Sequence, residues 1–134
     1  PKQLHQEVEV LKQLQEFSKP LFYNTHDREW GDAPQGYYLT DVKQKTLWHD
    51  NDSGAMAVLI KLPPGISEKV HYHPYANQWG LGLHGESEQA DGTLLSFNGT
   101  FSYMPQGEPH AAGRLTKESV VFIYWDGPGT KIAI

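Results

Sequence analysis

The chain has no cysteine among its 134 residues, and this absence removes several kinds of chemistry. Disulfide bonds, thiolate zinc sites and a cysteine nucleophile are all excluded. Basic residues are also scarce, because 11 Lys and Arg stand against 16 Asp and Glu for a formal net charge of -5. Proteins that bind nucleic acids usually carry a basic face, so we expect no nucleic-acid partner.

Long apolar runs are missing as well. No segment approaches the roughly 20 apolar residues that a membrane-spanning helix needs, so we expect no membrane partner. No basic start followed by an apolar stretch indicates a signal peptide, which leads us to expect a cytoplasmic protein. A chain of this length is typical of one domain that buries a core without disulfides.

The first part of the chain has helical spacing. In residues 2–18 the apolar Leu4, Val8 and Leu11 fall on one face, with lysine, glutamine and glutamate on the other, and Pro20 ends the pattern. We predict that residues 1–20 form an N-terminal helix packed on the body of the protein or on a second subunit. Residues 21–134 would then form a single domain.

From residue 36 onward the pattern changes to short strands. The segments 37–42, 54–62, 69–73, 78–86, 93–97, 101–105 and 120–125 are rich in β-branched and aromatic residues. Turn clusters such as HDNDSG, PPGIS and EQADG separate them. Strands that recur at short spacing, with no helix between them, predict an all-β sandwich or barrel.

One of these segments carries two histidines one residue apart, in the sequence HYH. Alternate side chains on a strand share a face, so His71 and His73 should point the same way. Imidazole suits zinc, iron, copper and nickel, whereas calcium and magnesium prefer oxygen ligands. Taken alone, such a pair is more often two solvated surface histidines than a metal site.

The residues around this pair resemble a known family. Residues 65–85, GISEKVHYHPYANQWGLGLHG, match the first cupin motif, G(X)5HXH(X)4E(X)6G, at every fixed position but one. Residues 99–110, GTFSYMPQGEPH, match the second motif, G(X)5PXG(X)2H, completely. The surrounding spacing is similar to that of the ChrR-like group of small single-domain bacterial cupins. The resemblance implies a cupin-type double-stranded β-helix, a jelly-roll barrel, over residues 21–134, and a homodimer paired through a strand edge.

The resemblance also implies a metal site. His71, His73 and His110 match the three metal-binding histidines of the family and would hold one divalent transition metal. Fe2+ is favoured, followed by Zn2+, Ni2+ or Mn2+. Gln78 stands where many cupins have a metal-binding glutamate, and this is the one departure. It would either bind the metal through its carbonyl oxygen or hydrogen-bond to a water or substrate at the metal.

Strand alternation extends the candidate site. If Gln78 points inward, so do Gly80, Gly82 and His84. The two glycines would leave room for a substrate, although a bend or bulge in the barrel wall would also explain them. Gln78 and His84 are the candidate catalytic residues, the latter as an acid or base, a further ligand, or simply a satisfied buried histidine. Tyr103 is a candidate for the substrate pocket, or else part of the barrel core.

Three functions are compatible with such a site. The resemblance implies a non-haem Fe(II) dioxygenase that acts on a diketone, hydroxy-ketone or phenolic small molecule. A zinc-dependent cyclase, lyase or isomerase would use the same ligands for Lewis-acid chemistry. A non-enzymatic sensory cupin that binds a metal or ligand is the third.

Overall fold

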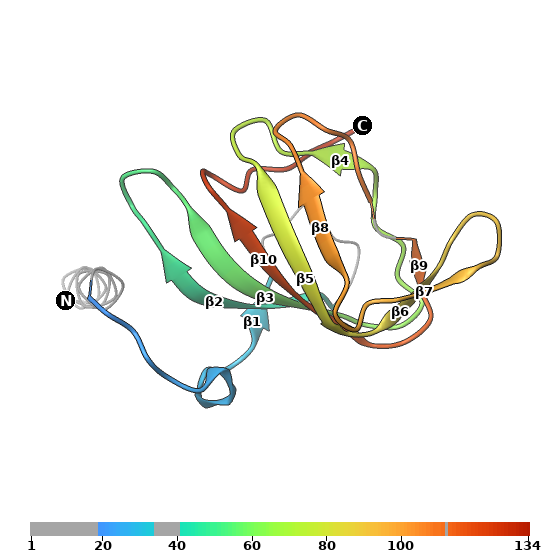
Figure 1. Ribbon diagram of the computed structural model, residues 1–134, viewed down its shortest axis with the longest axis horizontal. Coiled ribbons are helices and arrows are strands. Elements are labelled where there is room, and N and C mark those ends of the chain that lie inside the picture. Colours follow the sequence, from blue (N-terminus) through green and yellow to red (C-terminus); the bar gives the residue numbers. More distant parts are fainter. Residues whose placement is uncertain (1–18, 34–40, 112) are drawn as a thin grey trace, which may run out of the picture.

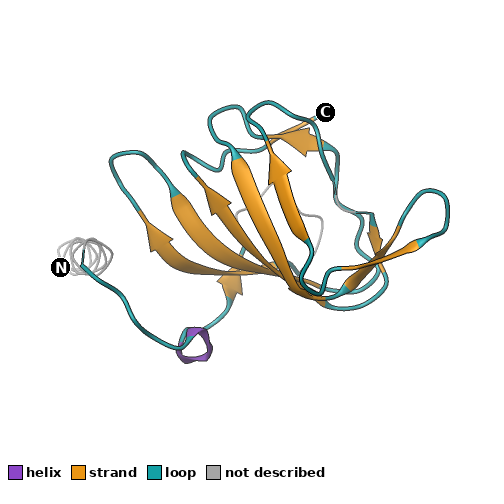
Figure 2. Ribbon diagram, in the orientation of Figure 1, coloured by secondary structure: helices purple, strands orange, loops and turns teal. Residues whose placement is uncertain are grey.

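The computed structural model describes residues 19–33, 41–111 and 113–134, and strands dominate them (Figures 1 and 2). The elements are the 3-10 helix η1 (Thr25–Asp27) and the strands β1 (Gly31–Asp32), β2 (Lys43–His49), β3 (Met56–Leu62), β4 (His71–Tyr72), β5 (Gln78–His84), β6 (Glu86–Glu88), β7 (Leu94–Ser96), β8 (Phe101–Met104), β9 (Arg114–Leu115), β10 (Ser119–Trp125) and β11 (Ile132–Ala133). The all-β prediction is confirmed. The helix predicted within residues 1–20 falls on residues 2–18, which lie outside the described residues.

The strands form one large antiparallel sheet and two small ones. The large sheet has the order β1-β2-β3-β10-β5-β8, so that β10, late in the chain, lies between β3 and β5. The small sheets are β11-β4 and β7-β6-β9. In Figure 1 they stand beyond β8, at the open edge of the large sheet. Crossovers between strands that are not consecutive are typical of jelly-roll barrels.

The core lies on the inner face of the two central strands. Val58, Ile60 and Leu62 of β3 and Ile123 and Trp125 of β10 are all buried. Most of these side chains are β-branched or aromatic, types that suit a pleated, packed surface. Alternate residues of the predicted strands therefore form the core.

Strand β2 was not predicted. Its sequence, KQKTLWH, is mostly polar, and the strand expected at 37–42 lies largely in a stretch that is not described. The buried Lys45 explains why the local pattern was misleading. Its ammonium donates a hydrogen bond to the carbonyl of Thr25 at 2.9 Å and lies 4.7 Å from the ring centroid of Trp30. These partners come from elsewhere in the chain, so the strand depends on tertiary contacts.

Within the part of the chain that the structure describes, no helix has the length and hydropathy needed to cross a membrane.

Strand β8 lies at one end of the large sheet, and Phe101 and Tyr103 on it are exposed, as is Leu81 on β5. The homodimer implied by the resemblance stays a prediction.

Candidate metal centre

Backbone hydrogen bonds bring the two histidine motifs together. The amide of His71 donates to the carbonyl of His110 at 3.0 Å, and the amide of His110 donates to the carbonyl of His71 at 2.8 Å. His73 lies two residues beyond His71, so its side chain returns to the same face. The backbone pairing fixes the Cα positions of these residues, so the fold itself brings the three imidazoles together.

The three imidazoles form a compact cluster. One ring nitrogen from each of His71, His73 and His110 lies within 4.8 Å of the others. The ring centroids of His71 and His110 are 4.3 Å apart, and each of these rings is 5.1 Å from that of His73. His71 and His73 are each 2% exposed, whereas His110 is partly exposed. The cluster is therefore deep on one side and accessible on the other.

The protonation of these rings suits metal binding. The Nδ1 atom of His71 lies 2.8 Å from the carbonyl of Lys69, and that of His110 lies 3.0 Å from the carbonyl of Glu108. A carbonyl only accepts, so each Nδ1 carries the hydrogen and leaves the Nε2 lone pair for an ion. Burial lowers the pKa of both His71 and His73 to about 4. Both imidazoles are consequently neutral at neutral pH.

His73 provides the test of whether these residues fit a metal. Among the residues that the structure describes, neither of its two buried ring nitrogens has a hydrogen-bond partner. Leaving a buried polar group unsatisfied costs about 1–3 kcal/mol, so such groups in a native protein usually have a bound partner. A transition-metal ion held by His71, His73 and His110 would satisfy one nitrogen of His73, and neutral imidazoles are ligands that such ions accept. The residues present therefore fit a divalent transition metal.

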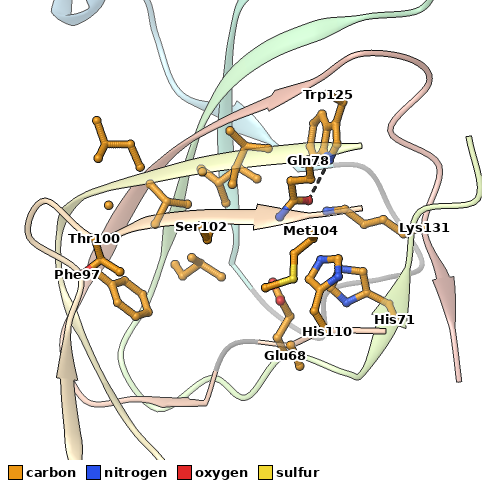
Figure 3. Close-up of a pocket in the computed structure, with 18 of the residues that line it drawn as sticks. Glu68, His71, Gln78, Phe97, Thr100, Ser102, Met104, His110, Trp125 and Lys131 are labelled. Carbon is orange, nitrogen blue, oxygen red and sulfur yellow. Dashed lines mark hydrogen bonds between the residues drawn. The ribbon is translucent and has the colours of Figure 1, made fainter. Parts of the chain in front are cut away.

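A cavity of about 220 Å³ lies over the cluster (Figure 3). Side chains of the large sheet form its apolar wall, and His71, His110 and Gln78 lie along its lining. Within the described residues the other lining residues are Ile60, Leu62, Glu68, Gly80, Leu81, Gly82, Leu95, Phe97, Thr100, Ser102, Met104, Ala111, Val121, Ile123, Trp125 and Lys131. A pocket with an apolar wall and a few polar groups at one end is typical of small-molecule sites.

Gly80 and Gly82 do line this cavity, but they do not create its space. A Cβ on Gly82 would collide with the carbonyl oxygen of Phe97, and one on Gly80 would lie 2.7 Å from Oγ of Ser102. The interpretation that the missing side chains leave empty volume is therefore wrong. At Gly82 the absence of a side chain lets the backbone of Phe97 approach β5 closely. The alternative that the sequence left open, a bulge in the barrel wall, also occurs here, because Val121 pairs with Gly82 and Val120 with His84.

The structure does not bring His84 or Tyr103 to the cluster. His84 is exposed and lies outside the cavity lining, so the expectation that it faces inward is wrong. The reason is a bulge, because Val120 pairs with His84 and Val121 pairs with Gly82, which leaves one extra residue on β5 and breaks the alternation. Tyr103 is 46% exposed and also lies outside the lining.

Gln78 lies in the lining with a defined orientation. The indole N–H of Trp125 donates to Oε1 of Gln78 at 2.8 Å (Figure 3). An indole can only donate, so the carbonyl end of the side-chain amide faces Trp125 and the NH2 group forms the other end. The two residues are direct partners in the pairing of β5 with β10.

Sequence reasoning missed several polar or aromatic lining residues, among them Trp125, Glu68 and Lys131. Trp125 ends a predicted strand, and its register with Gln78 could not be read before the strands were paired. Glu68 and Lys131 come from two different loops and belong to no motif. No local signal marks them, because only the folded chain places them beside the histidines.

A β-barrel fold with three converging imidazoles at the polar end of a cavity defines the class of protein as a cupin with a three-histidine site. Comparison with known families makes the assignment specific. The chain belongs to the ChrR Cupin-like domain family, whose model matches residues 18–129. No curated protein matches the chain.

Solved structures share this fold at low sequence identity. A putative acetylacetone dioxygenase from Methylibium petroleiphilum PM1 aligns with a TM-score of 0.67 and 17% identity, over 86% of this chain and 87% of that one. KdgF from Halomonas sp. aligns with a TM-score of 0.59 and 23% identity, over 79% and 94%. The DMSP lyase DddQ from Ruegeria pomeroyi DSS-3 gives 0.60 and 21%, over 81% of this chain and 61% of DddQ. At these identities the likeness is one of fold.

Proposed function

We propose that the protein is a metal-dependent enzyme for a small molecule, and specifically a non-haem Fe(II) dioxygenase that acts on a diketone, hydroxy-ketone or phenolic substrate. The observation that carries the proposal is the position of the three-histidine cluster beside a largely apolar cavity. The fold likeness to acetylacetone dioxygenases from Methylibium petroleiphilum and Acinetobacter johnsonii supports the choice of reaction. When bound, Fe(II) would supply the chemistry that lets dioxygen react with the substrate.

The protein's own residues would hold and surround the reactants. His71, His73 and His110 would grip the ion with neutral nitrogens, so that its positive charge is not offset by a carboxylate ligand. The apolar wall, which includes Ile60 and Val121, would keep water away from the substrate. Gln78, held by Trp125, would offer its NH2 group as a hydrogen-bond donor near the ion.

Zinc chemistry is the second candidate. A three-nitrogen ligand set is one that Zn2+ readily accepts, and the fold is also shared with the DMSP lyase DddQ. Zn2+ in the same site would polarise a carbonyl group of the substrate. The choice of metal therefore separates an oxygenase from a lyase, cyclase or isomerase, and a sensory protein would retain metal without turnover.

The deciding experiment is elemental analysis of the purified protein, followed by oxygen uptake after anaerobic loading with Fe(II). We expect iron, and oxygen uptake when acetylacetone or a catechol is added. Tightly held zinc with no uptake under any loading would overturn the dioxygenase and favour the zinc enzyme or the sensor.

A substitution at Gln78 tests its role near the ion. We expect Gln78→Ala to keep its metal and to lose activity by about 10- to 100-fold, the usual effect of removing a partner that lies outside the ligand set. Trp125→Phe removes only the indole N–H and should shift activity in the same direction, because the amide is then free to turn. If Gln78→Ala loses its metal as completely as a histidine variant, Gln78 is a ligand and this view is wrong.

A further inference from the structure

Lys131 places a positive charge in the same cavity as the histidine cluster. It comes directly before β11, and β11 pairs with β4 so that Ile132 lies opposite Tyr72 and Ala133 opposite His71. Continued by one residue, this register sets Lys131 opposite His73. Figure 3 shows its side chain extending into the cavity toward Gln78, on the side where His71 lies. The pairing of the two strands therefore fixes the ammonium group near the candidate ligands.

The surroundings of this ammonium are only partly polar. It lies 5.6 Å from the ring centroid of Trp125, and the side chain is partly buried. Burial lowers the pKa of Lys131 to about 8, while the carboxylate of Glu68 acts in the opposite direction. A charge with little water around it interacts more strongly with an ionic partner than a surface lysine does.

The charges that line the cavity balance as long as no ion is bound. Lys131 is the only lysine or arginine among the described lining residues, and Glu68 is the only carboxylate. The three histidines are neutral ligands, so a bound divalent ion keeps its full charge. With the ion in place, the polar end of the cavity has an excess of positive charge, and an anionic group in that position would be favoured.

We propose that Lys131 is a specificity-determining residue that binds an anionic oxygen of the substrate, either an enolate or a carboxylate. The proposal rests on the proposed function, because it assigns to the same cavity the substrate of that metal site. The apolar wall, with Phe97 and Ile123, would receive the rest of the molecule. A cavity volume of about 220 Å³ suits a small substrate.

A purely structural role for Lys131 makes a different prediction. If the lysine serves only to neutralise Glu68, then Glu68→Gln and Lys131→Met should damage the site in the same way. If Lys131 binds the substrate, Glu68→Gln removes a competing carboxylate and should preserve or strengthen anion binding. The two variants therefore separate the roles, since they change the charge of the cavity in opposite directions.

The test measures binding of acetate and of its neutral analogue acetamide by calorimetry, on protein loaded with Zn(II) so that no reaction with oxygen occurs. We expect Lys131→Met to weaken acetate binding by about 10- to 100-fold, the equivalent of one hydrogen bond to a charged group, and to leave acetamide binding unchanged. Lys131→Arg should restore the preference for acetate. The exposed Lys117 provides the control, and Lys117→Met should bind both probes as the unsubstituted protein does.

A second arm distinguishes enolate from carboxylate. Acetylacetone added to the Zn(II)-loaded protein should show the ultraviolet absorbance of its enolate, and Lys131→Met should reduce that absorbance at equal metal content. If Lys131→Met weakens the binding of acetylacetone more than that of acetate, the site is one for enolates. If it weakens the binding of acetate more, the site is one for carboxylates.

The proposal is overturned if Lys131→Met binds acetate as tightly as the unsubstituted protein, or if Glu68→Gln weakens acetate binding as much as Lys131→Met does. Failure of the proposed function would look different. In that case the unsubstituted protein would take up no oxygen after loading with Fe(II), or would retain no metal at all. The titrations on metal-free protein would still report whether Lys131 selects acetate over acetamide, because the ammonium group is present without the ion.

Discussion

His110→Ala is expected to abolish retention of the metal, and His71→Ala and His73→Ala should do the same. Each change turns a three-point grip into a two-point one, and losing one arm of a multidentate binder costs about 10²- to 10⁴-fold in affinity. The measurement is the metal content after dialysis against a weak chelator. The backbone hydrogen bonds between residues 71 and 110 do not depend on the side chains, so the fold should survive, as circular dichroism would show.

His84→Ala is the matched control for these variants. It removes an imidazole from the same part of the sequence, but His84 is exposed and outside the cavity lining. The variant should retain metal at the level of the unsubstituted protein. Equal metal loss in His84→Ala and His110→Ala would show that the three-histidine cluster does not hold the ion on its own. If all three cluster variants retain their metal in full, the proposal that these histidines bind it is wrong.

Gly82→Ala is expected to destabilise the protein by about 3 kcal/mol, at the upper end of the usual cost of overpacking. A methyl group at this position would collide with the backbone carbonyl of Phe97, which cannot rotate away as a side chain could. The amide of Gly82 also donates to the carbonyl of Thr100 at 2.9 Å, so the two segments are held together. Urea unfolding, followed by fluorescence, measures the change in the free energy of unfolding.

Gly31→Ala serves as the comparison. The nearest atom to a Cβ at Gly31 is the carbonyl oxygen of Gln44 at 3.8 Å, an ordinary contact distance. This variant should unfold at nearly the same urea concentration as the unsubstituted protein. If Gly82→Ala is equally stable, then Phe97 does not approach β5 as closely as the structure has it, and the wall of the cavity is more open.

The sequence was sufficient for the parts of the site that depend on local periodicity. His71 and His73 share a face because strands alternate, and the second motif supplied His110. The prediction for His84 rested on the same alternation and was wrong, because the bulge opposite Val120 depends on how β5 pairs with β10. A rule based on period two holds only as far as the ladder is regular.

The residues that remained hidden come from packing and not from pattern. Lys131 and Glu68 lie in loops, and only the pairing of β11 with β4 and the closure of the barrel set them around the cavity. The polar strand β2 was missed for a related reason, since Lys45 is satisfied by Thr25 and Trp30, which are distant in sequence. Contacts of this kind leave no trace in the composition of the segment itself.

The reciprocal amide–carbonyl pair between His71 and His110 has a consequence for how the protein acquires its ion. In small zinc domains the ligands gather only when the metal binds, so chelators unfold them. Here backbone hydrogen bonds already align two of the three donors, so the chain can stay folded whether or not the metal is bound. The metal should therefore be removable and replaceable without unfolding the protein. One preparation could then be loaded with several different metals and the loaded forms compared.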